Sequence, residues 1–455
     1  MKYAIISDLH GNLPALNAVL EDVSKRGITE FIFAGDYCLS SPYPDQVITA
    51  IRNIKNKHVI RGNEEHYLES LVGKDQSQWT DGQMQISYWN YRNISEDNRD
   101  YLLSQPVNVD LICDGVNIHI THTIESFIGE NEFRLIGPGV LAKRFKGKKI
   151  DPGILKKYII STIENDERFM EEISELEDGI YIFGHSHVQW SYKVPGKDVY
   201  LINPGSCGLP LDGIENTLPY TILDIENGNV KVEHIRVYFD LVSYSKTLKD
   251  STQFKEANVW TKIIMKELSS SREKITFFID YVNRYANDIG DNRRPFAVDT
   301  WETAYDKWEK SMSYVFYGNE EVAKVHSDRK VLKGIDTPLD LYDALTKVWC
   351  KETCAPRMQN EWTPENMTYG QCSITSFLVQ DIFGGIVKGV LLDDGNYHCY
   401  NVVDGHVFDL TSEQFEKELI YSPDDKVQIR EEHFRKEEKR QRYELLKEKL
   451  FLSVE

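Results

Sequence analysis

The chain has 455 residues, of which 41% are hydrophobic and 27% are charged, and its formal net charge is −19. Because this length exceeds one ordinary hydrophobic core, we expect a globular protein with two domains. The negative charge argues against an extended nucleic-acid partner, and no apolar run approaches the roughly 20 residues of a membrane span, so no membrane partner is expected.

The first part of the chain alternates between strand and helix patterns. Apolar, β-branched runs that predict strands lie at 3–6, 31–34 and 58–60. Apolar residues at helical spacing predict a helix over 12–25, and Pro14 suits its first turn. A second helix is expected to open near Pro44.

Further along, the patterns are more widely spaced. Strands are expected at 107–123, 180–184, 199–205, 220–224 and 230–237. A charged helical insertion is expected over 129–178, and helices over 255–310, interrupted at 291–295. The tail at 429–451 has the pattern of a charge-rich, solvated helix.

Short patches near the ends of apolar runs carry the candidate chemistry. Each places a small residue beside Asp, His or Asn, and together they hold Asp8, His10, Asp36, Asn63, His185 and His187. Residues at strand ends are held by rigid backbone at one edge of a sheet. Because these side chains offer nitrogen and oxygen but no thiolate, they suit Mn, Fe, Zn, Ni or similar divalent ions that serve hydrolysis.

These patches resemble the motifs of the calcineurin-like metallophosphoesterases, most closely their small prokaryotic phosphodiesterase branch. The motifs are Asp8-Leu9-His10-Gly11-Asn12, Gly35-Asp36, Gly62-Asn63-Glu64, Thr121-His122, Gly184-His185-Ser186-His187 and Asn203-Pro204-Gly205-Ser206. The resemblance implies an α/β fold, a four-layer α-β-β-α sandwich, and a two-metal site in which manganese is favoured.

The resemblance also implies a ligand set for each metal. One metal would take Asp8, His10, Asp36 and His187. The other would take Asp36, Asn63, His122 and His185, with Asp36 as the bridge. His119 is a rival for His122, but Thr121-His122 matches the family pattern.

The chain departs from the family pattern after Asn63. Many members have a His there that stabilises charge on the leaving oxygen, whereas this chain has Glu64, Glu65 and then His66. His66 could take that role from one position further along a helix, or could be a surface residue. Asn12 is a second candidate for stabilising the developing charge.

The C-terminal region holds a second set of candidate catalytic residues. Cys372 is expected to open a helix, which favours its thiolate, and His398 and Asp409 flank an expected hairpin turn at Asp404-Gly405. Such a Cys, His and Asp can form a catalytic triad, with Asp404 a weaker candidate for the acid. The alternative is an inactive module with a buried cysteine and a core histidine.

This region resembles the poorly characterised YunG-like family and, more broadly, transglutaminase- and papain-type cysteine folds. Its motifs include Gly370-Gln371-Cys372, Gly384-Gly385, His398 and Asp409-Leu410-Thr411. We therefore expect a smaller α+β domain at 335–455. The metallophosphoesterase domain is expected at 1–318, with a core at 1–240 and a helical extension at 241–318, and the boundary falls between about 312 and 335.

The function predicted first is a metal-dependent phosphodiesterase acting on a small, anionic, nucleotide-like phosphoester, with a metal-bridging hydroxide as nucleophile. A second hypothesis is a cysteine-dependent amide hydrolase or acyl transferase regulated by the metal domain. A third is a nucleotide sensor with slow turnover. Seven scattered cysteines and no leader pattern at the N-terminus favour a cytoplasmic protein. A second copy of the chain, in a homo-oligomer, is an open alternative to a monomer.

Overall fold

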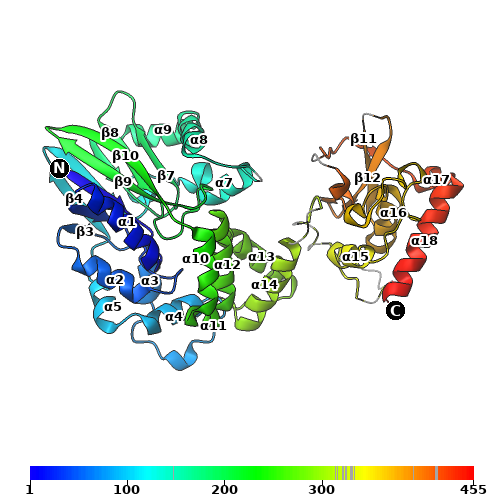
Figure 1. Ribbon diagram of the computed structural model, residues 1–455, viewed down its shortest axis with the longest axis horizontal. Helices are drawn as coiled ribbons and strands as arrows, with labels where there is room; N and C mark the ends of the chain where they lie inside the picture. The colour runs from blue at the N-terminus through cyan, green and yellow to red at the C-terminus, as the bar shows by residue number, and fades with distance from the viewer. Residues whose placement is uncertain are drawn as a thin grey trace. The chain divides into compact units, whose positions relative to one another are not determined.

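The computed structural model describes residues 1–146, 148–312, 314, 316–319, 322, 325–327, 332, 334–392, 394–415 and 419–454. Contacts divide the chain into two compact units, Met1–Tyr305 and Asp306–Glu455, and each is described by itself. In Figure 1 the colours run from blue to yellow-green through the first unit and from there to red through the second.

The first unit is built on two β-sheets. One sheet has the strand order β10-β9-β1-β2-β3 and the other β4-β5-β6-β8-β7. The strands are β1 (Lys2–Ile6), β2 (Glu30–Phe33), β3 (Lys57–Val59), β4 (Asn108–Cys113), β5 (Val116–Thr121), β6 (Gly179–Ile182), β7 (Gln189–Lys193), β8 (Val199–Pro204), β9 (Thr217–Glu226) and β10 (Asn229–Tyr238). Strands β1, β2 and β3 run parallel, as do β5, β6 and β8, so each set delivers its carboxyl ends to one edge.

The two sheets pack face to face through an apolar layer. Ile5 of β1 belongs to the same buried cluster as Ile120 of β5 and Ile182 of β6. The alternate residues Ala4 and Ile6 belong to another cluster, on the opposite face of the first sheet. This two-residue alternation lets one short strand contribute to two cores.

Helices cover the two outer faces, which completes the four layers. On the first sheet Leu16 of α1 and Val47 of α2 join the cluster of Ile6. On the second sheet Ile159 of α8 packs in a cluster with Phe183. The helices of this part are α1 (Leu13–Lys25), α2 (Pro44–Asn53), α3 (Asn63–Glu69), α4 (Gln85–Asn93), α5 (Glu96–Leu103), α6 (Phe133–Ile136), α7 (Pro138–Arg144), α8 (Pro152–Glu164) and α9 (Glu167–Ser174).

A helical extension follows β10 and returns to the sandwich. Its helices are α10 (Leu241–Thr247), α11 (Thr252–Glu256), α12 (Asn258–Ser270), α13 (Ile275–Asp288) and α14 (Val298–Met312). Ile264 of α12 shares a buried cluster with Leu39, which follows β2, so the extension lies beside the strand ends that carry the candidate ligands. Figure 1 shows α10 and α12, in green, between the sheets and α13 in this view.

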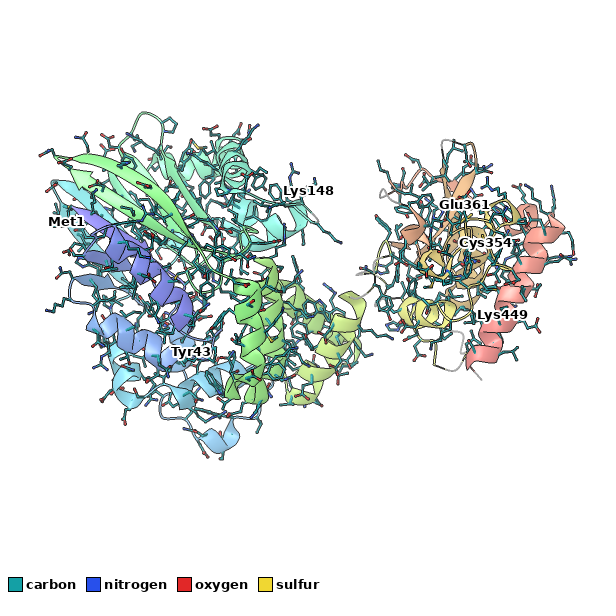
Figure 2. All side chains as sticks on the ribbon, in the orientation of Figure 1. Met1, Tyr43, Lys148, Cys354, Glu361 and Lys449 are labelled. Atoms are coloured by element: carbon teal, nitrogen blue, oxygen red, sulfur yellow. The ribbon has the colours of Figure 1, made fainter. Side chains whose placement is uncertain are left out.

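The second unit has a sheet of strand order β13-β12-β11-β14. Its elements are α15 (Pro338–Leu345), α16 (Cys372–Phe383), β11 (Ile386–Leu391), β12 (Tyr397–Val403), β13 (His406–Phe408), β14 (Lys426–Val427), α17 (Arg430–His433) and α18 (Glu437–Val454). Helix α16 packs on this sheet, because Phe377 shares a buried cluster with Val387 and Cys399. Figure 2 shows the side chains that fill the interior of each unit.

Most of the expected elements are confirmed. The helix over 12–25, the early strands and the interruption between α13 and α14 appear at the expected places. Strand β7 (Gln189–Lys193) was not expected, because its Gln, Ser and Lys hide the apolar alternation of Trp190 and Tyr192. Among the described residues no helix combines the length and apolar character needed to cross a bilayer.

The stretch expected between the domains, 312–335, lies in part outside the described residues. Those of its residues that are described do not form a polar linker, since Tyr314, Phe316, Val322 and Val325 are buried in the core of the second unit. The contact boundary accordingly falls earlier, between Tyr305 and Asp306. Isolated apolar residues among polar neighbours gave no periodic signal from which this burial could be predicted.

Candidate functional site

The candidate ligands follow consecutive strands of both sheets. Asp8 and His10 follow β1, Asp36 follows β2, and Asn63 opens α3 just after β3. His122 follows β5, and His185 and His187 follow β6. The left-handed backbone conformation, which residues other than glycine seldom adopt, occurs at Asp8, His10, Asp36, His185 and His187, with φ between 49° and 71°. Such conformations cost free energy and concentrate at functional sites.

The loops that carry the ligands approach one another so closely that only small residues fit beside the ligands. A Cβ atom on Gly184 would lie 2.1 Å from Oγ of Ser7 and 2.5 Å from Oδ2 of Asp8. A Cβ atom on Gly35, whose φ is +99°, would lie 2.5 Å from Nδ1 of His122. The pairing of a glycine with each ligand therefore follows from the distance at which the loops meet.

Two groups of ligand atoms converge, and a third overlaps both. Asp8, His10 and His187 form one group, Asp36, His122 and His185 form another, and His10, Asp36 and Glu64 form the third; within each, one ligand atom per residue lies within 4.8 Å of the others. In the first group, Nε2 of His187 is 2.9 Å from Nε2 of His10 and 3.5 Å from Oδ1 of Asp8.

The second group includes the amide of Asn63. Nε2 of His122 lies 3.0 Å from Oδ1 of Asn63 and 3.1 Å from Oδ2 of Asp36. The ring centroids of His122 and His185 are 5.2 Å apart. By contrast, His119 pairs with Asp110 at 2.7 Å and belongs to none of these groups, so His122 is the histidine that the fold brings to the others.

Three imidazoles use Nδ1 for a hydrogen bond behind the site, so their Nε2 atoms are the ones that face the other ligands. Nδ1 of His122 lies 2.7 Å from the Ala34 carbonyl, and Nδ1 of His187 lies 2.8 Å from the Leu209 carbonyl. Nδ1 of His10 lies 2.9 Å from Oε2 of Glu64. A carbonyl or carboxylate oxygen only accepts, so each Nδ1 must donate its proton, as histidines that bind metals through Nε2 do.

With these tautomers, the contact between His10 and His187 bears directly on metal binding. Their Nε2 lone pairs face each other at 2.9 Å, which repels unless a proton or a cation lies between them. Asp8, within 4 Å of both nitrogens, adds negative charge to the same place. The donor set present therefore fits a divalent cation.

The pKa values of the ligands also favour a bound cation. Burial raises the pKa of Asp8 to about 6, and the neighbouring Asp36 adds to that rise. Burial and the charge of His122 lower the pKa of His185 to about 4. Without cations, two buried carboxylates and several imidazoles strain one another, and bound positive charge would relieve this.

A cavity of about 430 Å³ opens onto these groups. Its polar wall includes His10, Asp36, Asn63, Glu64, His185 and His187. Its apolar wall includes Leu39, Met84, Phe133, Leu211, Trp260, Ile264 and Ile279. The strand-end loops thus supply the reactive side, and the helical extension supplies part of the apolar side.

The second unit brings its own candidate residues together. Cys372 is the first residue of α16, His398 lies on β12, and Asp409 directly follows β13. Nε2 of His398 is 2.5 Å from Oδ2 of Asp409, and both side chains are 1% exposed. The charge of Cys372 raises the pKa of His398, so the two side chains are close neighbours. Asp404 occupies the turn between β12 and β13 with a positive φ, so it does not join this group.

Comparison with known proteins identifies the first unit. Residues 1–228, half of the chain, match the calcineurin-like phosphoesterase superfamily domain. The chain belongs to this superfamily. Residues 337–455 match the YunG protein family, as the motifs around Cys372 and His398 predicted.

Relatives of each part are known. The chain is 27% identical over 262 residues to the uncharacterized protein MJ0912 of Methanocaldococcus jannaschii, covering 54% of this chain and 92% of that protein. It is 37% identical over 71 residues to the uncharacterized protein YunG of Bacillus subtilis, covering 16% of this chain and 61% of that protein. A solved metallophosphoesterase from Sphaerobacter thermophilus shares 19% identity, with a TM-score of 0.41, and is matched over 60% of this chain and 100% of that one.

Two predicted catalytic residues of the phosphoesterase domain are not positioned for catalysis. Asn12 is fully buried; its Oδ1 accepts the N–H of Ala15 at the start of α1, and its Nδ2 donates to the Gly208 carbonyl. His66 has a side chain that is 56% exposed and paired with Glu69, and it does not line the cavity. Asn12 is thus a helix cap, and His66 points to solvent because it lies one helical step beyond the site.

Glu64 and Glu65 were not among the predicted site residues. Glu64 directly follows Asn63, and its carboxylate accepts the proton of His10. Glu65 is fully buried, and its carboxylate accepts the backbone N–H groups of Asp36, Tyr37 and Gly62. Two acids beside a ligand at the start of a predicted helix were the available signal, because carboxylates satisfy free N–H groups there.

The turn that carries His185 and His187 is supported from behind. Nδ2 of Asn203 donates to the Gly184 carbonyl at 2.8 Å and to Oγ of Ser186 at 3.0 Å. Glu132, 1% exposed, accepts the indole N–H of Trp190 at 2.8 Å. Burial raises the pKa of Glu132 to about 8, although hydrogen bonds from Ser186 and Trp190 oppose the rise.

Proposed function

We propose that the first unit is a metal-dependent phosphodiesterase that acts on a small, nucleotide-like phosphoester. The observation that carries this proposal is the contact between His10 and His187, whose acceptor nitrogens face each other at 2.9 Å beside Asp8 on the wall of a cavity. Membership of the phosphoesterase superfamily supplies the reaction class.

The residues present divide into two sets that suit two divalent ions, with manganese favoured. Asp8, His10 and His187 would hold one ion, Asn63, His122 and His185 the other, and Asp36 would bridge them. When bound, such a pair neutralises phosphate oxygens and acidifies a water molecule. The chain's own contribution is orientation, since Glu64, Ala34 and Leu209 fix three imidazole rings through their Nδ1 protons.

The size and lining of the cavity suit a phosphate that carries a small organic substituent. About 430 Å³ accommodates a molecule the size of a nucleotide. The lining also includes the aromatic side chains of Trp260 and of Phe133, which packs against His185, and such rings suit a flat ring in the substrate. The chain's negative charge and a cavity of about 430 Å³ do not suit an extended polynucleotide.

A diester is favoured over a monoester by the residue after Asn63. Glu64 lines the cavity as the acceptor of the His10 proton, so this position lacks an imidazole that could stabilise charge on the leaving oxygen, and a carboxylate there repels the dianion of a monoester more than the monoanion of a diester. We therefore expect bis(4-nitrophenyl) phosphate to be hydrolysed faster than 4-nitrophenyl phosphate.

Hydrolysis of bis(4-nitrophenyl) phosphate with Mn²⁺ tests the proposal. The native protein should release 4-nitrophenolate, and Asp36→Ala should abolish the release, while the exposed Glu69→Ala variant keeps it. Equal rates for the native protein and Asp36→Ala would refute the proposal. Tight Mn²⁺-dependent nucleotide binding without turnover would instead favour the sensor hypothesis.

A cytoplasmic location belongs to the same proposal. All seven cysteines are free thiols, five of them buried, which suits a reducing compartment. Measuring the state of the thiols in freshly isolated protein checks this expectation.

A further inference from the structure

Three side chains that the phosphoesterase reaction does not use converge at the start of α16. Cys372 is partly exposed, whereas His398 and Asp409 behind it are buried. A partly exposed cysteine beside a buried His-Asp pair differs from a structural cysteine, which is usually enclosed by apolar groups. Nε2 of His398 contacts Oδ2 of Asp409, and the charge of Cys372 acts on the same imidazole.

The carboxylate of Asp409 is held at both oxygens. Its Oδ1 accepts the backbone N–H and the hydroxyl of Thr411, each at 2.9 Å. Its Oδ2 accepts the hydroxyl of Tyr421 at 2.7 Å and lies 2.5 Å from Nε2 of His398. With Asp409 fixed in this way, the imidazole has one orientation, in which Nε2 is used and the other ring nitrogen is left for Cys372.

An apolar ring covers one side of the imidazole. Phe415 meets His398 edge to face, with centroids 4.7 Å apart and planes at 87°. The covering reduces access of water to the ion pair, which strengthens the attraction between His398 and Asp409. A histidine that was only filling space would not need a carboxylate with four partners.

The surroundings of Cys372 stabilise its thiolate. It is the first residue of a 12-residue helix, where free backbone N–H groups favour negative charge. A hydrogen bond from the Cys399 thiol and then the charge of His398 hold the pKa of Cys372 well below its usual value. The charges of Asp409 and Cys372 raise the pKa of His398 to about 10, even though burial opposes this.

We propose that Cys372, His398 and Asp409 form a second catalytic site, which cleaves amide bonds through a thioester on Cys372. The thiolate attacks the carbonyl carbon, so a C–S bond forms while the carbonyl electrons move to oxygen. The C–N bond then breaks, and the proton of His398 goes to the departing amine. Water attacks the thioester, His398 takes the proton of that water, and a carboxylic acid leaves with the thiolate restored.

The proton that His398 can donate indicates an amide substrate rather than an activated ester. An amine is a poor leaving group and must be protonated as it departs, whereas a thiolate or a phenolate leaves without a proton. A thiolate paired with an imidazolium supplies the nucleophile and the acid at the same time. The substrate class is therefore a carboxamide or a peptide amide.

The first experiment measures acylation with 4-nitrophenyl acetate as the probe, on the full-length protein. The native protein should release a burst of 4-nitrophenolate that matches the protein concentration, and Cys372 should gain one acetyl group by peptide mass spectrometry. Cys372→Ala removes the burst, and the partly exposed Cys350 in the same digest is the internal control. A native burst no larger than that of Cys372→Ala overturns the proposal, as does acetylation of Cys350 to the same extent as Cys372.

The second experiment separates the acid role of His398 from its effect on the thiol. The activated amide 4-nitrotrifluoroacetanilide is compared with the ester for the native protein and His398→Gln, at a pH high enough that Cys372 is ionised in both. His398→Gln should then lose about 100-fold in rate on the anilide and little on the ester. Equal losses on both probes overturn the assignment to amides, and circular dichroism confirms that the variant is folded.

Discussion

Nδ1 of His10 lies 2.9 Å from Oε2 of Glu64, the residue that directly follows the ligand Asn63. This contact joins the loop after β1 to the start of α3, and it orients the His10 ring toward His187. A carboxylate behind a metal-binding histidine fixes the tautomer and makes the ring more basic. Glu64 therefore acts on the metal centre through His10.

Replacing Glu64 with Gln should weaken divalent metal binding by about 10–100-fold, because the charge behind His10 is lost. Titration calorimetry with Mn²⁺ measures the affinity. His66→Gln is the matched control, since it lies on the same helix with its side chain in solvent, and its affinity should stay the same. An unchanged affinity in Glu64→Gln would contradict the role assigned to the carboxylate.

Glu65→Ala should lower the free energy of unfolding by about 1–3 kcal/mol, because buried N–H groups of the Asp36 loop lose their acceptor. Urea unfolding of the metal-free protein gives this value. Glu69→Ala, on the exposed face of the same helix, should change it by less than about 0.5 kcal/mol. If both variants are equally stable, Glu65 does not hold the loop.

Asn12→Ala should cost about 1 kcal/mol of stability through the lost cap of α1, while the turnover number of the folded protein stays the same. Denaturant midpoints and kcat, both measured well below the unfolding transition, separate the two effects. A large fall in kcat with unchanged stability would show that Asn12 stabilises the transition state after all.

Glu132→Gln should flatten the pH dependence of stability. The folded protein holds the Glu132 proton up to a pKa of about 8, whereas the usual value is 4.5. Between these values the folded state binds more protons than the unfolded chain, so the free energy of unfolding falls as pH rises. Urea unfolding in EDTA at about pH 5 and about pH 8 should show a smaller fall for Glu132→Gln than for the native protein. Equal falls would mean that Glu132 titrates normally.

The sequence determined the strand ends of the first unit and the residue types placed there. Apolar runs of four or five residues ending in Asp8, Asp36 and His185 could be recognised because strand periodicity and turn residues are local signals. Cys372 was assigned from a local pattern as well. It stands before an apolar run, which predicted that it opens a helix, and it is the first residue of α16. Local backbone preferences were enough for these assignments.

Only the tertiary structure decided which side chains meet and which face away. Asn12 and His66 carry groups that could stabilise charge on a phosphate. However, the Asn12 side chain caps α1, and the His66 side chain lies on the exposed face of α3. Glu64 reaches His10 across 54 positions of sequence, and His10 reaches His187 across 177. Contacts between residues so far apart in sequence form only when the two sheets pack together. A local sequence pattern does not encode them, because it reports on neighbouring residues and not on which distant side chains become buried together.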